Sequence, residues 1–498
     1  MTIGELLSRA AITIDPGPLS QDMLDATSSG VFYDSRVVVP GGVFVAIVGA
    51  HLNGAAFADD ARSRGAALVL AEEDSPAVTR QPWIRVPDAR AALAALAAAF
   101  YGNPSHSLSV VGVTGTNGKT TTTYLIESIF EHAGVKTGRM SSIANRVAAD
   151  QPEQRAVRTT PEAPDLQAWL RLMRDRETRA CVMEVSSHAL TLRRVDQVRF
   201  AGGVFTNLAR DHLDFHGDMG RYFGAKARLF EMLPAGAPAM VNVDDAHGRE
   251  LAKTVTRPVT YGLNRAADVT ATRLDLGLDG TRVEARTPRG TLHLESPLIG
   301  RITAYNLMAA VATSVAFDVS FRGIEEGVRA LVGVPGRMQT VTGPKDDVTV
   351  IVDFAHTDDA LRGLLDAVRP LTQGNVFTVF GCGGDRDATK RPLMGAVAAR
   401  MSDRVFLTSD NPRSEQPVDI IADIERGLAN VRMPSVVIPD REEAIARAIW
   451  EAAAGDLVVI AGKGHERYQE IGTRTLPFDD GAVARAALSK RRSSSRVG

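Results

Sequence analysis

A glycine-rich segment that follows an apolar run carries the residues best suited to bind a nucleotide. Residues 110–113 are apolar, and Gly115-x-x-Gly118-Lys119-Thr120 comes next, before apolar residues at helical spacing. Glycines let backbone N–H groups converge on phosphate oxygens, and a helix N-terminus adds its positive dipole end. Lys119 would reach the outer phosphates, and the Thr120 hydroxyl would bind Mg²⁺. The strict motif has one more glycine, so the pattern predicts a variant P-loop; a ligand-free turn is the structural alternative.

Two other residues, Glu184 and His212, have side chains of types that can bind a metal ion. Glu184 follows the apolar run 181–183, where an unpaired carboxylate would be costly to bury. We interpret it as a Mg²⁺ ligand, with a helix N-cap or a surface position as the alternative. His212 lies in the polar segment 207–216. It is a second candidate ligand, although a lone histidine is more often structural.

Lys226 is unusual because its neighbours on a helix would be apolar. Tyr222, Lys226 and Phe230 are four residues apart and therefore share one helix face. A lysine buried on such a face has a lowered pKa. A neutral amine can add CO₂ to give a carbamate, which is an anion able to bind Mg²⁺. The alternative is a lysine whose amine reaches solvent past an apolar stem.

The elements that position these residues are expected to be buried strands. Unbroken apolar runs alternate along the chain with segments whose apolar residues have helical spacing. Such runs are typical of parallel sheets with helices on both faces, in which ligands bind beyond the carboxyl ends of the strands. In the middle of the chain the runs are residues 110–113, 181–183, 204–205 and 240–243. In the last third they are residues 348–352, 376–380, 405–407 and 457–460.

The length of 498 residues predicts about three domains. Breaks in composition place them at residues 1–105, 106–335 and 336–498, and we expect the basic tail, about 488–498, to be disordered. With 44% hydrophobic and 23% charged residues, the chain can bury several cores, which excludes wholesale disorder.

Charge and cysteine usage narrow the class of protein further. The net charge is −2, from 57 Lys+Arg and 59 Asp+Glu, so no strong overall field attracts nucleic acid or anionic lipid. The two cysteines, Cys181 and Cys382, form no disulfide framework. Residues 1–5 do not begin a signal peptide, and the most apolar stretch, residues 91–100, is shorter than the ~18 residues of a membrane span. We expect a cytoplasmic protein.

Four strings in the middle of the chain together resemble the Mur ligases: residues 115–121, 183–190, 211–217 and 225–230. Further matching strings are residues 34–36, 159–162, 305–306, 334–338, 385–387, 390–395, 410–413 and 462–466. The resemblance runs from about residue 30 to 470. It implies an α/β fold with three domains: an α/β N-terminal UDP-MurNAc-binding domain, a central P-loop ATPase domain with a parallel sheet, and a Rossmann-like C-terminal domain that binds an amino acid.

The resemblance also assigns roles to individual residues. It implies an ATP site made of Thr114, Gly115, Thr116, Asn117, Gly118, Lys119, Thr120, Asn306, Arg337 and Asp353. The nucleotide-sugar dipeptide would be bound by Ser35, Ala50, His51, Leu52, Thr159, Thr160, Ser186 and Arg194. The added amino acid would be bound by Arg386, Asp410, Asn411, Pro412, Arg413, Gly462 and Glu466. Two Mg²⁺ ions would be held by Thr120, Glu184, His212 and Lys226, the last as N6-carboxylysine, and the catalytic residues would be Lys119, Glu184, His212 and Lys226.

The implied reaction is an ATP-dependent ligation in peptidoglycan precursor synthesis. Within the family, the chain resembles the members that make UDP-N-acetylmuramoyl-tripeptide. The D-Glu γ-carboxylate of UDP-MurNAc-L-Ala-D-Glu would be activated as an acyl phosphate and then joined to an amine. Arg413 is associated in this family with diaminopimelate, and Glu466 would balance the distal ammonium of that substrate. We expect a monomer that acts on small molecules, with no nucleic acid or membrane partner.

Several alternatives remain open at this level. Leu192, Phe354 and Asp358 depart from the family pattern, which leaves room for a related enzyme that adds L-lysine, LL-diaminopimelate or another amine. An Asn-Pro turn such as residues 411–412 is also common in proteins that bind no amino acid. Folylpolyglutamate synthetase-like chemistry uses the same loop and metal residues. A P-loop regulatory switch is the non-enzymatic alternative.

Overall fold

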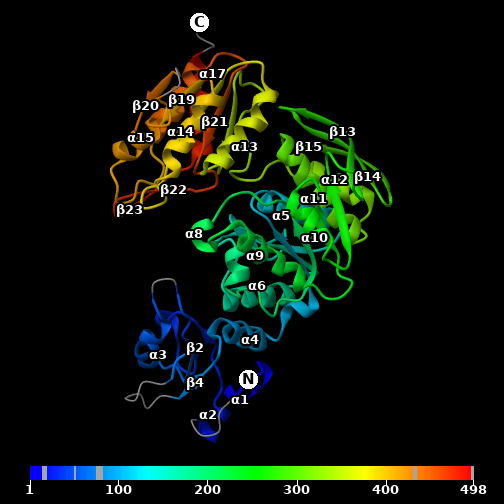
Figure 1. Cartoon of the computed structure of the whole chain (residues 1–498), viewed down its shortest axis with the longest axis vertical. Coiled ribbons are helices and arrows are strands. Elements are labelled where there is room, and N and C mark those ends of the chain that lie inside the picture. Colours follow the sequence, from blue (N-terminus) through cyan, green and yellow to red (C-terminus); the bar gives the residue numbers. More distant parts are fainter. Residues whose placement is uncertain (14–18, 50–51, 75–81, 430–433, 495–498) are drawn as a thin grey trace. The chain divides into compact units, whose positions relative to one another are not determined.

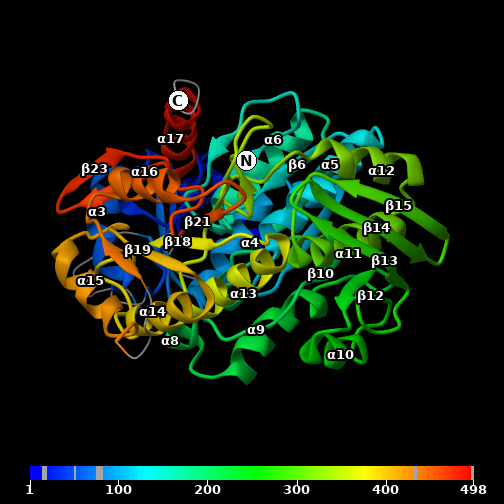
Figure 2. The ribbon, with the colours of Figure 1, turned by 90° about the horizontal axis from the view of Figure 1, so that it is seen from above.

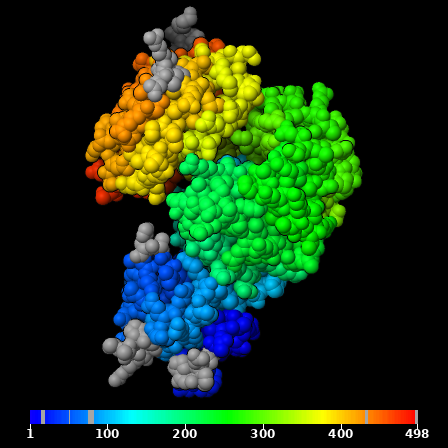
Figure 3. Space-filling model, in the orientation of Figure 1, coloured from blue at the N-terminus to red at the C-terminus, as the bar shows by residue number. Residues whose placement is uncertain are grey.

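The computed structural model describes residues 1–13, 19–49, 52–74, 82–429 and 434–494 (Figure 1), and the remaining residues are grey in Figure 3. The chain folds into two compact units. The first contains residues 1–261 and 309–323, and the second contains residues 262–308 and 324–498.

The first unit begins with a small parallel sheet in the order β1-β2-β3-β4. Alternate residues of β2 and β3 point to opposite faces, so Val43 and Leu68 pack with α1 and α4 while Phe44 and Val69 pack with α3. The strands are β1 (Val31–Phe32), β2 (Val43–Val45), β3 (Leu68–Ala71) and β4 (Trp83–Arg85). The helices are α1 (Ile3–Arg9), α2 (Gln21–Asp25), η1 (Ser35–Val37), η2 (Gly54–Phe57), α3 (Ala58–Ser63), α4 (Ala89–Tyr101) and η3 (Pro104–Ser107).

A larger sheet follows, in the order β12-β11-β10-β5-β9-β6-β7-β8. It is parallel from β12 to β6, and β7 and β8 add antiparallel pairs at one end. Its strands are β5 (Ser109–Thr114), β6 (Thr137–Met140), β7 (Ala144–Arg146), β8 (Gln154–Arg155), β9 (Ala180–Glu184), β10 (Phe200–Phe205), β11 (Ala239–Asn242) and β12 (Pro258–Gly262). Strand β5 is flanked by β9 and β10, so the loop after β5 lies between the loops that follow those two strands.

Helices of the same unit connect these strands. They are α5 (Lys119–His132), α6 (Ala163–Asp175), α7 (Ser187–Thr191), α8 (Leu213–His216), α9 (Met219–Glu231) and α10 (Ala246–Ala252). Helix α11 (Arg301–Ala316) ends in this unit, and α12 (Phe321–Ala330) begins in it. The predicted apolar runs of the middle segment are all strands, and the predicted helix after the glycine-rich loop is α5. Both predictions are confirmed.

The second unit contains an antiparallel three-stranded segment that the sequence reasoning missed: β13 (Val269–Gly277), β14 (Gly280–Thr287) and β15 (Gly290–Ser296). Tight turns join the strands at Gly280 (φ 136°) and Gly290 (φ 128°), where only glycine adopts the backbone conformation without strain. Asp279-Gly280 between alternating apolar residues is a hairpin signal that would have revealed them.

The second unit also contains a six-stranded sheet, in the order β16-β17-β21-β18-β19-β20. It is parallel except for the β16–β17 pair. Its strands are β16 (Gln339–Thr340), β17 (Thr349–Asp353), β18 (Val376–Phe380), β19 (Arg404–Leu407), β20 (Ser435–Val437) and β21 (Leu457–Ala461). A separate hairpin pairs β22 (Tyr468–Ile471) with β23 (Arg474–Pro477).

Helices cover both faces of this sheet. On one face pack α13 (Asp358–Val368), η4 (Arg369–Leu371), α14 (Lys390–Met401) and α15 (Pro417–Glu425), and on the other α16 (Arg441–Glu451) and α17 (Asp480–Ser494) (Figure 2). The predicted α/β class with parallel sheets covered on both faces is therefore confirmed.

The prediction of a disordered basic tail is wrong for residues 488–494, which complete helix α17. Leu488 is 1% exposed and packs in the C-terminal core. Arg491 forms an ion pair of 2.7 Å with Asp347, and Arg492 forms one with Asp346. These contacts hold the basic residues against the domain. Residues 495–498 lie outside the described part of the chain.

Arg441 and Asp480 form a fully buried ion pair that joins α16 to the start of α17. The Nε–Oδ1 distance is 2.7 Å, both side chains are 0% exposed, and Arg441 also donates to the carbonyl oxygens of Ser409 and Ala461. Arg441→Met would leave the Asp480 carboxylate buried without its partner, so we expect the free energy of unfolding to fall by about 3–5 kcal/mol. Urea unfolding measures this. The double variant Arg441→Met/Asp480→Leu should be less destabilised than Arg441→Met alone; a single variant within about 1 kcal/mol of the wild type would contradict the prediction.

Within the described residues, no helix is long and apolar enough to cross a membrane. Cys181 and Cys382 are both buried and unpaired, as expected from their positions in the sequence.

Candidate active site

The glycine-rich loop joins β5 to α5 at the centre of the larger sheet. Lys119 begins α5, and its Nζ donates to the carbonyl oxygens of Gly115 and Thr116, at 2.9 Å each. Gly115 has a φ of 145°, and a Cβ at this position would come within 1.8 Å of Thr206 Oγ1. Only glycine therefore fits where the loop passes β10. The loop has the strand-to-helix geometry of a phosphate-binding site.

Lys226 lies on α9 and reaches the same loop. It is 1% exposed, its Nζ donates to the Gly115 carbonyl oxygen at 2.8 Å, and it lies 4.4 Å from the centre of the Tyr222 ring. No carboxylate of the described residues forms an ion pair with it. Burial lowers the pKa of Lys226 well below its usual value, and the nearby charge of Lys119 lowers it further. The predicted apolar environment and lowered pKa are confirmed.

Glu184 ends β9, beside the loop, and is 1% exposed. Its Oε1 accepts hydrogen bonds from the backbone N–H (2.8 Å) and the hydroxyl (3.3 Å) of Ser142. The same hydroxyl lies 3.1 Å from Thr120 Oγ1. Ser142 thus connects two of the predicted metal ligands. Sequence reasoning missed it, although two consecutive serines after a strand-like segment at residues 137–140 were a signal.

His212 lies in the segment between β10 and α9, with a left-handed backbone (φ 53°). Its ring centre is 4.8 Å from that of His188 and 6.2 Å from that of Tyr222. Burial lowers the pKa of His212; the negative charge of Asp211 opposes this shift, and the positive charge of Lys119 adds to it. The lowered pKa favours the neutral imidazole, which is the form that binds a metal.

Among the described residues, no three histidine, cysteine, aspartate or glutamate side chains form a metal-binding cluster. The predicted ligand set does not need one, because it combines one carboxylate, one imidazole, one hydroxyl and Lys226. A buried amine of lowered pKa with no carboxylate partner fits the requirement for carbamate formation.

Three predicted substrate residues lie directly beyond Glu184. The Thr160 hydroxyl donates to the Glu184 carbonyl oxygen at 2.9 Å and accepts from the Ser186 N–H at 3.1 Å. Arg194 Nη1 donates to the Thr160 carbonyl oxygen at 3.2 Å. Thr159 adjoins this group in sequence and is half-buried.

The other predicted residues of that substrate site lie in the N-terminal part of the unit. Ser35 is buried in η1, and Leu52 is 66% exposed. Ala50 and His51 lie outside the described residues.

A group of arginines around Glu162 was not anticipated. The Glu162 carboxylate is buried and lies 2.9 Å from Arg194 Nε, 3.7 Å from Arg90 Nη1 and 3.9 Å from Arg158 Nη1. Burial and the charges of the two neighbouring guanidinium groups lower the pKa of Arg194. Three cations around one carboxylate leave an excess of positive charge that suits an anionic substrate. Arg158 is four residues from Glu162, but Arg90 and Arg194 are distant in sequence, so no local pattern predicts the whole group.

In the second unit, the predicted amino-acid residues gather after β19 and β21. Asn411 is 2% exposed, its Nδ2 donates to Glu466 Oε2 at 2.9 Å, and its Oδ1 accepts from Lys463 Nζ at 2.9 Å. A Cβ at Gly462 would come within 2.7 Å of Asp410 Oδ2, so this glycine allows the two segments to approach. Lys463 is 0% exposed and was missed as a member of this group.

Arg386 lies in the loop after β18, and Arg413 lies close to that loop. Arg413 Nη1 donates to the Gly384 carbonyl oxygen at 2.8 Å. An added Cβ at Gly383 would lie 3.1 Å from Arg413 Nη1 and 3.8 Å from Arg386 Cγ. The structure therefore brings Arg386, Asn411, Arg413, Gly462 and Glu466 to one edge of the C-terminal sheet.

The remaining predicted nucleotide residues also belong to the second unit. Asp353 ends β17, and its carboxylate accepts from the backbone N–H groups of Met338 (2.7 Å) and Ala355 (2.8 Å). Burial raises the pKa of Asp353, and the positive charge of Arg337 opposes this shift. The Arg337 guanidinium lies 4.7 Å from the centre of the Phe354 ring. Asn306 is buried on α11.

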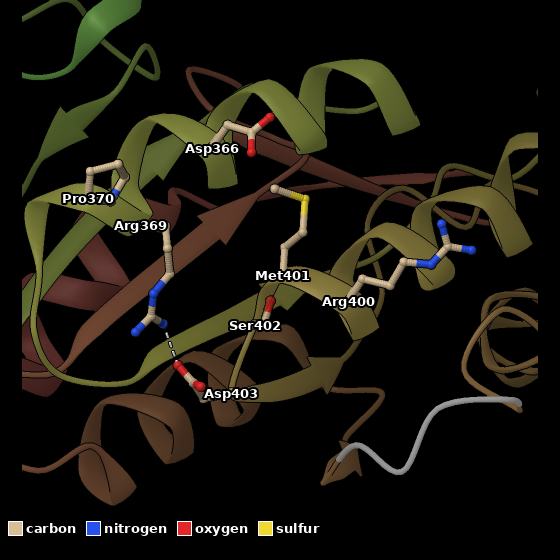
Figure 4. A pocket seen from close by; sticks show the side chains of 7 residues that line it. All are labelled: Asp366, Arg369, Pro370, Arg400, Met401, Ser402 and Asp403. Carbon is tan, nitrogen blue, oxygen red and sulfur yellow. Dashed lines mark hydrogen bonds and ion pairs between the residues drawn. The ribbon is translucent and has the colours of Figure 1, made fainter.

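An open surface pocket lies at the opposite edge of the C-terminal sheet, where α13 and α14 end and β19 begins (Figure 4). An ion pair between Arg369 and Asp403 crosses it at 2.5 Å. None of the predicted site residues lines it. The residues that do are Asp366, Arg369, Pro370, Arg400, Met401, Ser402 and Asp403.

Three family models match most of the chain. They are the Mur ligase family catalytic domain over residues 27–101, the Mur ligase middle domain over residues 113–314 and the Mur ligase glutamate ligase domain over residues 336–464. A ligase of Solibacter usitatus is 45% identical over 98% of both chains. The chain belongs to the Mur ligase family. As a Mur ligase it is an enzyme, an ATP-dependent ligase that forms amide bonds, so the alternative of a regulatory switch is wrong.

Two relatives of this Mur ligase carry the same name. The Solibacter usitatus protein and one from Gloeobacter violaceus (44% identical, 99% of both chains) are both called UDP-N-acetylmuramoyl-L-alanyl-D-glutamate--2,6-diaminopimelate ligase. A solved structure of that name is 33% identical, covers 99% of both chains and has a TM-score of 0.69. A folylpolyglutamate synthase from Mycobacterium tuberculosis is 17% identical, with a TM-score of 0.60 over 79% of this chain and 93% of its own, and shares the fold alone.

Proposed function

We propose that this Mur ligase joins diaminopimelate, in its meso form, to the D-Glu γ-carboxylate of UDP-MurNAc-L-Ala-D-Glu, with ATP as co-substrate. The observation that carries the proposal is the full-length identity of 45% and 44% to ligases named for this reaction. The enzyme would act as a cytoplasmic monomer on small molecules, in peptidoglycan precursor synthesis. Its domains would be residues 1–105 for UDP-MurNAc, 106–335 for ATP and 336–498 for the amino acid, and the family matches support these boundaries.

The first step is phosphoryl transfer. The γ-carboxylate of the acceptor attacks the γ-phosphate of ATP in line, which gives an acyl phosphate and ADP. Lys119 stabilises charge on the outer phosphates, and backbone N–H groups of residues 114–118 surround them. The loop geometry and the position of Lys119 at the start of α5 support this role. Asn306, Arg337 and Asp353 are further residues that we assign to nucleotide binding.

The metal ligands are the Thr120 hydroxyl, the Glu184 carboxylate, the His212 imidazole and a carbamate on Lys226. Two Mg²⁺ ions bound there would neutralise charge on the transferred phosphoryl group. The buried amine of Lys226, which forms no ion pair with any described residue, and the lowered pKa values of Lys226 and His212 support the assignment. Ser142 holds Oε1 of Glu184, and Oε2, which forms no hydrogen bond with any described residue, would bind the metal.

The residues that we assign to the acceptor, UDP-MurNAc-L-Ala-D-Glu, all belong to the first unit. Ser35, Ala50, His51 and Leu52 hold its UDP-MurNAc end, and Thr159, Thr160, Ser186 and Arg194 hold the dipeptide. The hydrogen bonds that connect Thr160 to Glu184 and Ser186 support this assignment, since they place the dipeptide residues beside a metal ligand. The arginines around Glu162 add positive charge for an acceptor that carries carboxylates and a diphosphate.

The second step is attack by the amine. The amino group of diaminopimelate attacks the acyl phosphate carbonyl, a tetrahedral intermediate forms, and inorganic phosphate leaves as the amide is made. Activation of the carboxylate supplies the driving force that amide formation lacks in water. The residues that hold the incoming amino acid are Arg386, Asp410, Asn411, Pro412, Arg413, Gly462 and Glu466. Their convergence at one sheet edge supports this role.

A phosphate-release assay tests the function. Purified enzyme receives ATP, Mg²⁺ and UDP-MurNAc-L-Ala-D-Glu, with meso-diaminopimelate, LL-diaminopimelate or L-lysine in separate reactions. We expect release only when the acceptor and meso-diaminopimelate are both present, with a product of the matching tripeptide mass. Release with L-lysine or LL-diaminopimelate instead would assign the related activity that Leu192, Phe354 and Asp358 left open. No release with any amine would contradict the proposal.

Ser142 gives a testable prediction about the metal site. Ser142→Ala removes the hydroxyl between Thr120 and Glu184 but keeps the backbone hydrogen bond. Loss of a group that orients a metal ligand lowers metal affinity about 10- to 100-fold, so the Mg²⁺ concentration for half-maximal activity should rise by about that factor. Ser142→Thr keeps the hydroxyl and is the matched control. Calorimetric Mg²⁺ titration in the presence of a non-hydrolysable ATP analogue checks the affinity directly, and equal values for the alanine variant and the wild type would exclude the role.

A further inference from the structure

The residues assigned to the two ends of the acceptor come from different parts of the first unit. Ser35 and Leu52, assigned to the UDP-MurNAc end, follow strands β1 and β2 of the small sheet. Thr160 and Arg194, assigned to the dipeptide, follow strands β8 and β9 of the larger sheet. The acceptor is a single covalent molecule, so it can contact both groups only when they lie at a fixed separation. Contacts that fix this separation therefore affect how tightly the whole acceptor binds.

Helix α4 of the N-terminal part packs directly on the start of α6. Ala94, Ala97 and Ala163 form a small buried cluster between the two helices, with exposures of 0%, 0% and 2%. At the N-cap of α4, the Asp88 carboxylate lies 2.7 Å from Arg193 Nε. The first turn of α4 is therefore held against the segments that carry the dipeptide residues.

Arg90, in that first turn, has contacts in two directions. Its Nη2 donates to the Val48 carbonyl oxygen at 3.3 Å, and its Nη1 lies 3.7 Å from Glu162 Oε2. The Arg90 side chain is 17% exposed, so most of its length is fixed by packing. Val48 pairs with Asn53 in an isolated antiparallel bridge, which encloses Leu52. Arg90 thus connects a segment of the UDP-MurNAc end to Glu162.

From Glu162 the contacts continue to the dipeptide residues and a proposed metal ligand. The Glu162 side chain is 5% exposed, and its Oε1 lies 2.9 Å from Arg194 Nε. Arg194 Nη1 donates to the Thr160 carbonyl oxygen at 3.2 Å, and the Thr160 hydroxyl donates to the Glu184 carbonyl oxygen at 2.9 Å. A continuous set of contacts therefore joins the backbone of Val48 to that of Glu184.

Tyr33 makes a second connection to the same region. Its ring packs against the N-terminal core, two residues before Ser35. Its hydroxyl donates to Oδ2 of Asp165, in the first turn of α6, at 2.9 Å. Both connections start next to residues of the UDP-MurNAc end and reach the segment 162–165. Because this segment adjoins Thr160, they act on one place in the dipeptide site.

We propose that Arg90 and Tyr33 are positioning residues of the acceptor site: they hold the residues for the UDP-MurNAc end at a fixed separation from those for the dipeptide, and Arg90 does so through Glu162 and Arg194. The proposal rests on the proposed function and extends it to two residues outside the assigned set. The UDP end is remote from the reacting carboxylate. Its binding energy would then help to place that carboxylate beside the metal ligands.

Calorimetric titration with two ligands tests the proposal. UDP-MurNAc-L-Ala-D-Glu occupies both ends of the site, whereas UDP-MurNAc lacks the dipeptide and occupies one. The lost contacts involve charged partners, so we expect the Kd for the whole acceptor to rise about tenfold in Arg90→Met and about threefold or more in Tyr33→Phe. The Kd for UDP-MurNAc should stay unchanged in both variants. Equal losses of affinity for the two ligands would mean that these residues only support the N-terminal fold, which overturns the proposal.

Two further variants separate positioning from charge. Arg90→Lys keeps the positive charge, but its single amine cannot contact Val48 and Glu162 together, so it should bind the acceptor as weakly as Arg90→Met. Wild-type affinity in Arg90→Lys would overturn the role. Arg62→Met removes an exposed arginine of α3 in the same part of the chain and is the matched control, which should keep both Kd values. Melting temperatures check that each variant is folded.

A double variant tests whether Arg90 acts through Arg194. Residues that act through the same contacts have losses that do not add. Arg90→Met/Arg194→Met should therefore bind the acceptor no more weakly than Arg194→Met alone. Fully additive losses would show that Arg90 acts independently of Arg194 and would overturn the proposal.

The binding measurements also separate this inference from the proposed function. Wild-type enzyme that binds the acceptor but releases no phosphate with any amine would contradict the proposed function, and the variants would still decide the inference. Wild-type enzyme that binds UDP-MurNAc-L-Ala-D-Glu no more tightly than UDP-MurNAc would overturn the inference, since the two ends would then not be bound together.

Discussion

Lys119→Met is expected to lower the rate of acceptor-dependent ATP turnover by about a thousandfold. The Lys119 amine is held at the glycine-rich loop by the carbonyl oxygens of Gly115 and Thr116, at 2.9 Å each, where the outer phosphates of a bound nucleotide would take their place. Methionine has a similar length but no charge, so charge that develops on the transferred phosphoryl group would lose a direct partner. Phosphate release at saturating substrate concentrations measures the effect.

The matched control for this prediction is Lys253→Met, which removes the charge of an exposed lysine at the end of α10. It should retain the wild-type rate. A Lys119→Met variant that is folded, as shown by its melting temperature, and nearly as active as the wild type would remove the glycine-rich loop from the chemistry.

Lys226→Arg is expected to reduce turnover by roughly a hundredfold or more, because it removes a proposed metal ligand and leaves a cation in its place. The pKa of Lys226 is lowered well below its usual value by burial, so the fraction of neutral amine near pH 7 is raised, and only the neutral amine adds CO₂. Arginine stays protonated and cannot form the carbamate.

A spectroscopic readout makes this second prediction independent of activity. In buffer with ¹³C-labelled bicarbonate, the wild type should show a carbamate carbon resonance that is absent from Lys226→Arg and from the uncharged variant Lys226→Gln. The uncharged variant guards against loss of folding through a buried guanidinium. A wild type without the resonance, or a folded Lys226→Gln with full activity, would refute the role.

The parts of the fold that follow from local patterns were predictable from sequence. Residues 110–113 and 457–460 are unbroken apolar runs because parallel strands are buried on both faces, and both are strands here. The position of Lys226 on an apolar helix face likewise followed from spacing of four residues. The meander β13–β15 was missed because its exposed faces give a weaker, alternating pattern. The helical tail was missed because its basic residues are neutralised by Asp346 and Asp347, about 140 residues earlier in the chain.

The candidate site, like the fold, contains residues that the sequence identifies and residues that only the structure reveals. Residues within continuous motifs, such as Lys119 and Arg413, could be identified directly. Ser142 and Glu162 act through contacts between segments that are distant in sequence, and serine and glutamate at such positions are ordinary surface residues in most proteins. Their roles depend on which side chains the sheets bring together, which no single segment specifies.

The most direct test of the account is the transfer of oxygen from the acceptor to phosphate. UDP-MurNAc-L-Ala-D-Glu labelled with ¹⁸O in the γ-carboxylate is incubated with enzyme, ATP, Mg²⁺ and meso-diaminopimelate. If the carboxylate attacks ATP and the amine then displaces phosphate, one labelled oxygen must appear in each phosphate released, together with the tripeptide product. Unlabelled phosphate in the presence of that product would exclude an acyl phosphate and contradict the central claim.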